Sequence, residues 1–376
     1  MSSGLVTSRR NRRTPYTECV ESLGVSGFSI VNHTLLPKSF ARSVEEDYWH
    51  LKEHVQLWDV GCQRQVELRG PDAALLAQKM TPRDLSAMTP GQCYYTPVID
   101  NHAGLLNDPV LLKRASDWFW FSIADSDLLL WAKALALGMN LDVEVREPDV
   151  WPLAVQGPRA EDLVARVFGD GVRSVRYFSF LECDFHSRQL VVARSGYSKQ
   201  GGYEIYLDDS PLGITLWDTL WEAGADLQVA PGCPNLIERI EAGLLSYGNE
   251  MTRENNPLEI NLDRFCHLEG EIDYIGRSAL EAIAAQGPSQ RMRGLLIDGT
   301  PCPPCGKPWP VLVGDIKVGQ VTSAIWSPAF RQNVGLSLID KDHWNPGTPV
   351  TVLLPDGHEL GAVITSLPFT VSSSTP

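Results

Sequence analysis

The sequence predicts an α+β protein with two similar α+β halves, followed by a small β domain. Three observations support this fold class. The chain has 376 residues, of which 43% are hydrophobic, enough for roughly two to three domains with buried cores. A strand, a Gly-Pro turn and a helix follow one another at two places before residue 170. Short segments of alternating apolar and polar residues dominate after about residue 290.

The repeated pattern is the main sign of two halves. Its first copy covers residues 66–80 with the turn at Gly70-Pro71, and its second covers residues 153–168 with the turn at Gly157-Pro158. A duplication of this kind predicts two halves packed as one unit, with a pocket between them. Gly-Pro turns before helices also arise by chance, so a coincidence remains the alternative.

The organisation of the chain follows from these patterns. Residues 1–45 are polar and are expected to form an irregular extension, residues 46–285 the α+β unit, and residues 290–376 the C-terminal β domain. In that last part, alternating residues on both sides of Asp356-Gly357 predict a hairpin, and Gly314-Asp315 marks another.

A further helix is expected between Asn235 and Tyr247. Its apolar residues Ile237, Ile240 and Leu244 recur at spacings of three and four. Arg239 would then lie on a different face of this helix.

Composition excludes several classes of partner. Lys and Arg total 32 against 46 Asp and Glu, a formal charge of −14, which argues against nucleic acid or an anionic membrane as the main partner. Eight scattered cysteines suit a reducing cytoplasm. Cys302 and Cys305 form the one close pair, and they lack the second pair or nearby histidines that zinc requires. We therefore expect a cytoplasmic protein without a metal site.

Three segments carry candidate chemistry, whereas the usual motifs of serine hydrolases, nucleotide enzymes and zinc proteases are missing. After the glycine-bearing loop 195–202, a strand with period two places Glu204 and Tyr206 on the face opposite Tyr203 and Ile205. A carboxylate beside an aromatic ring suits a heteroaromatic ligand with ring N–H donors. An ordinary exposed strand face is the alternative.

The other two segments are less specific. Asp108 ends the run Leu-Leu-Asn-Asp at residues 105–108, where it is either a turn residue or a positioned base. Arg239 belongs to a charged stretch from residue 238 to residue 255, whose members can simply pair with one another.

These three segments, in this order and with residues 319–324 in the β tail, resemble the folate-dependent aminomethyltransferase family, which includes the T-protein of the glycine cleavage system. The resemblance spans nearly the whole chain. Within this family, five segments look most like the dimethylsulfoniopropionate demethylases: residues 51–55, 58–60, 92–95, 198–202 and 251–255.

The resemblance implies a folate-binding α+β unit followed by a C-terminal β-barrel or jelly-roll-like domain. It implies that tetrahydrofolate accepts an S-methyl group from dimethylsulfoniopropionate, which yields methylmercaptopropionate and 5-methyltetrahydrofolate. The expected partners are therefore a small sulfonium substrate and folate, and a homodimer is compatible with the family.

Site residues follow from the resemblance position by position. Glu204 is expected to bind the pterin ring nitrogens with Tyr206 beside it, Asp108 to be the catalytic aspartate near N5, and Arg239 to meet the anionic folate tail. The substrate residues expected from it are the aromatic Tyr95, Tyr197 and Trp326, with Lys199 for the propionate carboxylate. A sulfonium is already an activated methyl donor, and aromatic faces bind it without overstabilising the ground state.

Other activities of the same fold remain open. They are a glycine cleavage-type aminomethyltransferase, a demethylase of glycine betaine or dimethylglycine, and a folate-binding relative without catalysis. Production of 5-methyltetrahydrofolate from the sulfonium would separate all of these.

Overall fold

The structure of the chain is a computed structural model that describes residues 8–370. It divides into two compact units, each described here by itself. Among the described residues, the first unit comprises residues 8–78, Leu85–Thr96 and Asp108–Asn235, and the second comprises Lys79–Asp84, Pro97–Asn107 and residues 236–370. No helix within the described residues is both long enough and apolar enough to cross a membrane.

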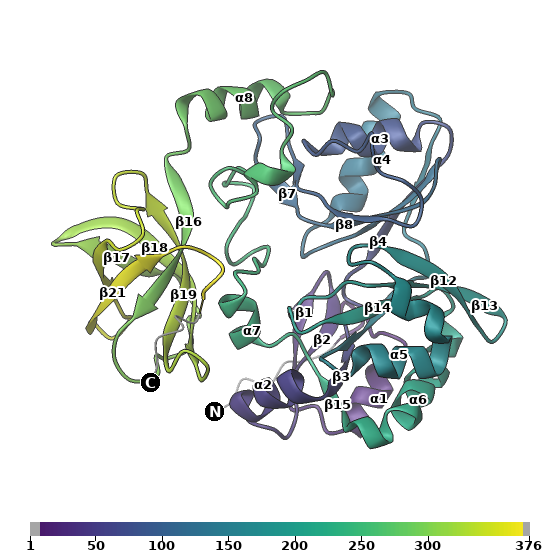
Figure 1. Cartoon of the computed structure of the whole chain (residues 1–376). Coiled ribbons are helices and arrows are strands. Elements are labelled where there is room, and N and C mark those ends of the chain that lie inside the picture. Colours follow the sequence, from purple (N-terminus) through teal and green to yellow (C-terminus); the bar gives the residue numbers. More distant parts are fainter. Residues whose placement is uncertain (1–7, 371–376) are drawn as a thin grey trace. The chain divides into compact units, whose positions relative to one another are not determined.

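The first unit contains a two-stranded hairpin and two larger sheets (Figure 1). The hairpin pairs β1 (Gly27–Val31) with β2 (Thr34–Ser39). The five-stranded antiparallel sheet has the order β10 (Glu144–Arg146), β4 (Gln65–Arg69), β9 (Trp118–Ser122), β8 (Val110–Ala115) and β5 (Cys93–Tyr95). The six-stranded sheet has the order β12 (Phe180–Phe185), β13 (Arg188–Ala193), β14 (Gly202–Leu207), β11 (Trp151–Gln156), β3 (Val55–Asp59) and β15 (Val229–Gly232).

Helices cover these sheets. The first unit has α1 (Thr17–Ser22), α2 (Val44–Glu53), α3 (Ala73–Met80), α4 (Leu128–Gly138), α5 (Ala160–Phe168) and α6 (Gly213–Ala223). Apolar residues of α1, α5 and α6 share one core with one face of the six-stranded sheet. Short 3-10 turns add Asp170–Ser174, Ser210–Leu212 and Ala225–Leu227.

A second core lies between the two large sheets. Cys93, Leu112 and Trp120 come from the five-stranded sheet, and Val191 and Tyr206 come from the six-stranded sheet. We call this cluster the inter-sheet core. It matters for function because strand alternation places every second residue of β5, β8 and β14 on this side.

The repeated strand–turn–helix pattern appears in both halves of the first unit. Gly70 joins β4 to α3 at φ +139°, and Gly157 joins β11 to α5 at φ +118°. A Cβ atom at Gly70 would lie 2.7 Å from the Asp142 carbonyl oxygen, and one at Gly157 would lie 2.4 Å from that of His54. Both turns therefore need glycine, for its positive φ and for the close approach of a second backbone. The predicted α+β fold class is confirmed.

The N-terminal segment differs from the expected irregular extension. Residues 17–39 form α1, β1 and β2, and Tyr16 and Val20 are fully buried in the core of the six-stranded sheet. The Tyr16 hydroxyl donates a hydrogen bond to the Trp151 carbonyl oxygen at 2.9 Å. Tyr16, Cys19 and Val20 have helical spacing, which is the local signal for this element. Because the residues around them are mostly polar, composition alone did not predict this helix.

A buried carboxylate ties this segment to β3. Asp59 accepts hydrogen bonds from the Thr14 hydroxyl at 2.6 Å and from the Gly61 backbone nitrogen at 3.1 Å. Burial raises the pKa of Asp59 to about 7. The pKa of an aspartate in the unfolded chain is about 3.9. At pH values between about 3.9 and 7, Asp59 is therefore protonated in the folded chain and ionised in the unfolded chain.

We expect this proton to make stability depend on pH. Because the folded-state pKa is the higher one, the stabilisation is present at low pH and is lost as pH rises through about 7. Relative to the Asp59→Asn variant, the wild-type protein should lose about 2 kcal/mol of unfolding free energy between pH 5 and pH 8. Urea denaturation at both pH values measures this difference. Replacing the exposed Asp117 by asparagine is the control, and a wild-type profile parallel to that of Asp59→Asn would contradict the prediction.

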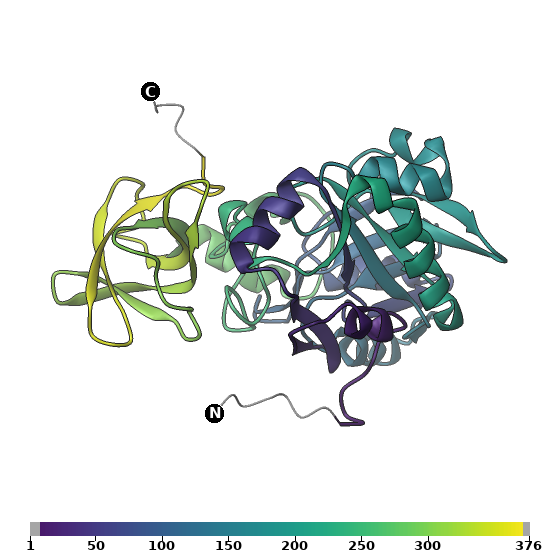
Figure 2. The ribbon, with the colours of Figure 1, turned by 90° about the horizontal axis from the view of Figure 1, so that it is seen from below.

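The second unit contains the predicted C-terminal β domain, which is a closed six-stranded barrel. It also holds the strand pair β6 (Val98–Ile99) and β7 (Leu105–Asn107), the helices α7 (Leu236–Glu241) and α8 (Arg277–Gln286), and the 3-10 turn Asp263–Phe265. Around the barrel the order is β16 (Gln290–Ile297), β19 (Gln332–Asp340), β18 (Ile316–Ser327), β17 (Trp309–Val313), β20 (Pro349–Leu353) and β21 (Glu359–Thr365). The barrel is drawn in light green and yellow in Figure 2.

Both predicted hairpins are confirmed as barrel strands. Gly314-Asp315 connects β17 to β18, where Val313 pairs with Ile316. Asp356-Gly357 lies between β20 and β21, where Leu353 pairs with Glu359.

The helix expected over residues 235–247 is shorter than predicted. It ends at Glu241 because Gly243 takes φ +65° and its N–H bonds to the Ile240 carbonyl oxygen, while the Leu244 N–H bonds to that of Arg239. This pair of bonds is the Schellman arrangement that ends helices at glycine. The apolar spacing extends beyond Gly243 to Leu244, so periodicity alone predicted too long a helix.

Candidate functional site

On strand β14, Glu204 and Tyr206 lie on the face that is directed toward the inter-sheet core. Tyr203, Ile205 and Leu207 pack into the core beneath α5 and α6, whereas Tyr206 belongs to the inter-sheet core. Glu204, which has the same parity as Tyr206, therefore lies on the Tyr206 face. The predicted division of the strand into two faces is confirmed, and the exposed-face alternative is wrong because both residues are buried.

Glu204 is a desolvated carboxylate. It is 5% exposed and accepts a hydrogen bond from the Ser195 hydroxyl through Oε2. Burial raises the pKa of Glu204, although hydrogen bonds from Ser195 and Gln63 oppose the rise. A carboxylate in this state gains much from a ligand that donates hydrogen bonds to it, because those bonds replace the water it has lost.

Tyr206 has a buried hydroxyl without a partner. Its oxygen makes no hydrogen bond with the residues that the structure describes. Burial raises the pKa of Tyr206 well above its ordinary value, and the negative charge of Glu204 adds to the rise. Buried hydroxyl groups are normally paired. An unpaired one beside Glu204 is consistent with a place for a polar ligand atom.

Asp108 is joined to another predicted site residue. The Tyr95 hydroxyl donates a hydrogen bond to Asp108 Oδ2 at 2.7 Å. Tyr95 pairs with Val110 across β5 and β8, so the phenol reaches along the end of this strand pair. Asp108 is 9% exposed. Such a bond orients the carboxylate.

Both pairs lie on the same side of their sheets. Cys93 belongs to the inter-sheet core, so Tyr95, two residues further along β5, faces the same side. Asp108 is joined to it through the Tyr95 hydroxyl. The negative charge of Glu204 adds to the burial that raises the pKa of the Cys93 thiol. The first unit therefore brings Glu204 and Tyr206 to one wall of the inter-sheet layer, and Tyr95 and Asp108 to the other.

The glycine-bearing loop 195–201 is built on a buried amide. Gln156 Nε2 donates to the Ser195 carbonyl oxygen at 3.2 Å, and Gln156 Oε1 accepts from the Ser198 hydroxyl at 2.7 Å. Tyr197 is partly buried in this loop, and Lys199 is exposed at φ +59°. The loop thus carries both predicted substrate residues between β13 and β14.

Two predicted residues belong to the second unit. Trp326 is half-buried on β18. Arg239 is buried on α7, where Nη1 contacts Glu250 Oε2 at 2.8 Å and Nη2 donates to the Ser323 hydroxyl at 2.7 Å. Glu250 also accepts from the Ser246 backbone nitrogen at 2.7 Å. This network supports the structural ion-pair alternative for Arg239.

Several contributors had no sequence signal of their own. Ser195 and Gln156 hold Glu204 and its loop through contacts that cross strands, and Tyr95 was expected to be an aromatic wall rather than a partner of Asp108. Within the described part of the chain, no group of three or more His, Cys, Asp or Glu side chains is placed to hold a metal ion.

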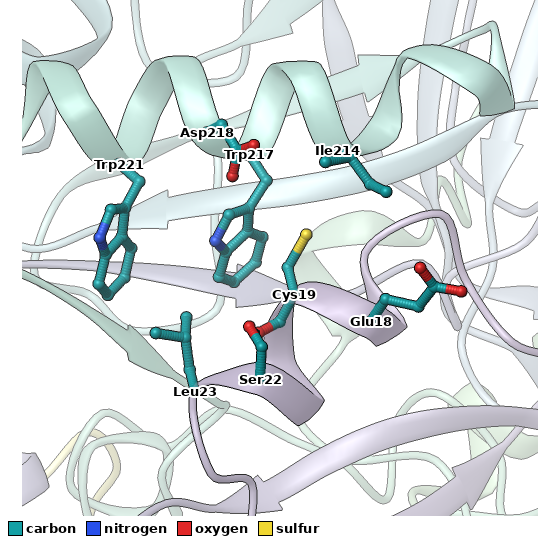
Figure 3. Close-up of a pocket in the computed structure, with 8 residues that line it drawn as sticks. All are labelled: Glu18, Cys19, Ser22, Leu23, Ile214, Trp217, Asp218 and Trp221. Carbon is teal, nitrogen blue, oxygen red and sulfur yellow. The ribbon is translucent and has the colours of Figure 1, made fainter.

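A surface pocket lies apart from these residues. Its volume is about 260 Å³, and it is lined by residues of α1 and α6 and by Leu23, which follows α1 (Figure 3): Glu18, Cys19, Ser22, Leu23, Ile214, Trp217, Asp218 and Trp221. Trp217 and Trp221 stand with nearly parallel rings, 15° apart. None of the predicted site residues lines this pocket.

Comparison with known proteins defines the class. Residues 17–270 match the GCVT N-terminal domain, and residues 290–370 match the glycine cleavage T-protein C-terminal barrel domain. The chain belongs to the glycine cleavage T-protein family. Within it, the chain is 53% identical to the dimethylsulfoniopropionate demethylase DmdA of Ruegeria pomeroyi over 94% of this chain and 96% of that protein.

More distant relatives have a different described activity. The aminomethyltransferase of Bacillus subtilis is 30% identical over 84% of this chain and 88% of that protein. The crystal structure of the glycine cleavage system aminomethyltransferase T from Bartonella henselae has a TM-score of 0.85 at 22% identity, covering 96% of this chain and 98% of that one. The structural likeness supports the fold alone.

Proposed function

We propose that the chain is a tetrahydrofolate-dependent demethylase that transfers an S-methyl group from dimethylsulfoniopropionate to tetrahydrofolate. The observation that carries this proposal is the 53% identity, over nearly the full length of both chains, to the Ruegeria pomeroyi demethylase. The aminomethyltransferase relatives, at 27–30% identity, give the coarser class.

The residues around Glu204 fit a reduced pterin. A pterin ring presents adjacent N–H donors, which a carboxylate accepts in a paired geometry. Glu204 is a buried carboxylate with a raised pKa, and the Tyr206 hydroxyl beside it is unpaired within residues 8–370. We assign Glu204 as the pterin ligand and Tyr206 as its neighbour in the same wall.

The chemistry requires positioning more than activation. Tetrahydrofolate supplies the nucleophilic N5 that takes the methyl group, while the electron pair of the broken carbon–sulfur bond stays on sulfur. We assign to the Asp108 carboxylate, oriented by Tyr95, the task of holding the pterin or accepting the N5 proton. Alignment of donor and acceptor supplies most of the acceleration in such transfers, up to ~7–11 kcal/mol.

The sulfonium pocket is assigned by residue chemistry. Aromatic faces bind a cation without the strong ground-state stabilisation of a carboxylate, and we assign this role to Tyr95 and Tyr197 of the first unit. Trp326 of the second unit keeps, as a separate proposal, the aromatic role that the resemblance implies. The exposed Lys199, on the loop beside Tyr197, is assigned to the propionate carboxylate. Arg239 already bonds to Glu250 and Ser323, so we assign it to holding the second unit together instead of to the folate tail.

The proposal is tested by incubating the purified chain with tetrahydrofolate and one methyl donor at a time. With dimethylsulfoniopropionate we expect stoichiometric 5-methyltetrahydrofolate and methylmercaptopropionate, detected by chromatography and mass spectrometry. Glycine betaine and dimethylglycine serve as the comparison donors. Turnover of a betaine with none of the sulfonium would assign the chain to another branch of the family, and folate binding without any product would refute an enzymatic role.

A further inference from the structure

An aromatic and cationic array on the five-stranded sheet is not used by the proposed chemistry. Its centre is Glu67 on β4, which is 1% exposed. Glu67 Oε2 accepts hydrogen bonds from the indole nitrogens of Trp118 and Trp120, each at 2.7 Å. Glu67 Oε1 accepts one from Arg146 Nε, also at 2.7 Å.

The register of the sheet creates this array. Glu67 lies directly opposite Arg146 on β10 and opposite Trp120 on β9, and Trp118 is the next residue on the same side of β9. The Arg114 guanidinium stacks on both indoles at 4.2 Å from each ring centroid. Charge-assisted bonds and cation–π contacts together hold both rings firmly.

Within residues 8–370, the Trp120 ring, and not the Trp118 ring, contacts the ring of Tyr206. The Trp120 ring lies 6.2 Å from the Tyr206 ring at 38°, and both belong to the inter-sheet core. Trp118 is partly buried at the edge of the same core, and the Arg69 guanidinium lies over its ring at 4.7 Å. The array therefore connects Glu67 through Trp120 to Tyr206, two residues from Glu204.

We propose that Glu67 is a positioning residue for the folate site. It holds the Trp120 ring against Tyr206, and so fixes the position of strand β14 where Tyr206 and Glu204 face the proposed pterin. This inference rests on the proposed function. Glu67 acts through Trp120 and Tyr206, so its loss should alter folate binding more than the chemical step. Donor binding should be unaffected.

The two tryptophans provide a matched pair of variants. Both donate to the same carboxylate oxygen at the same distance and stack on the same guanidinium. Trp120→Phe and Trp118→Phe each remove one indole N–H, and they should lower the thermal midpoint by similar amounts. Trp120→Phe should raise the dissociation constant for 5-methyltetrahydrofolate and the KM for tetrahydrofolate about five- to tenfold. Trp118→Phe should change either by less than about twofold.

Glu67→Gln completes the experiment. It keeps the side-chain shape but removes the charge, and it should reproduce the folate effect of Trp120→Phe with an unchanged KM for the methyl donor. Calorimetric titration with 5-methyltetrahydrofolate and steady-state kinetics give the readouts. Equal folate effects in the two tryptophan variants, or a wild-type dissociation constant in Glu67→Gln, would overturn the positioning role.

Glu204→Ala separates the two proposals. If that variant loses folate affinity while the tryptophan variants behave alike, only the positioning role is wrong. If it binds folate as tightly as the wild-type protein does, the assigned pterin site is wrong, and the positioning role falls with it.

Discussion

Replacing Glu204 by alanine is expected to weaken folate binding at least about a hundredfold and to leave the fold intact. Two hydrogen bonds from ring N–H groups to a charged, buried acceptor contribute about 1.5–3 kcal/mol each. The folded protein tolerates the change because Glu204 bears a desolvation cost, visible in its raised pKa. Calorimetric titration with 5-methyltetrahydrofolate measures the affinity, and circular dichroism follows the thermal midpoint.

The control for this variant is Asp184→Asn on strand β12 of the same sheet. Asp184 is exposed and accepts a hydrogen bond from the Gln189 side chain, so its loss should leave folate affinity within about twofold, as expected for a surface group. An unchanged dissociation constant in Glu204→Ala would move the pterin site elsewhere.

Glu204 should also couple folate binding to pH. Its pKa is raised in the ligand-free protein, and N–H donors from a pterin would lower it again. Binding then releases protons at pH values between the bound and free pKa, and affinity rises with pH through this range. Titrations in buffers of different ionisation enthalpy measure the release, which Glu204→Gln should abolish.

Replacing Asp108 by asparagine is expected to lower kcat about 10²- to 10⁴-fold, the usual contribution of a positioned acid or base. Folate affinity should change by only a few-fold, because Glu204 provides the main pterin contact. Asparagine keeps the size of the side chain and can still accept the Tyr95 hydrogen bond. Steady-state rates with dimethylsulfoniopropionate, compared with calorimetric affinities, separate the two effects.

Tyr95→Phe is the companion variant. It keeps the Asp108 carboxyl group but removes the 2.7 Å bond that orients it, so kcat should fall about tenfold, less than in Asp108→Asn. If Asp108→Asn turns over at the wild-type rate, Asp108 is a turn residue at the start of β8 and not part of the reaction.

Local pattern was enough for much of the candidate site. Alternation along residues 203–207 separated the Glu204 face from the core face, and the structure places the two faces in two different cores. The two Gly-Pro turns predicted the junctions between β4 and α3 and between β11 and α5. These features depend on neighbours within a few residues, so the sequence carries their signal directly.

Other features depend on residues distant in sequence. Arg239 reaches Ser323, and Tyr16 reaches Trp151, and no local pattern foretells such partners. The N-terminal extension was misjudged for this reason: three apolar residues at helical spacing in a polar segment form an element only because a sheet core receives them.

By itself the sequence determined the α+β class, the barrel hairpins, the faces of β14 and the residue types available for chemistry. Tertiary structure alone decided that Tyr95 orients Asp108, that Ser195 and Gln156 support Glu204 and its loop, and that Glu67 joins two indoles to one carboxylate. The physical reason is register. Which side chains face each other across strands is set by pairing and packing over the whole sheet, and that pairing joins residues far apart along the chain.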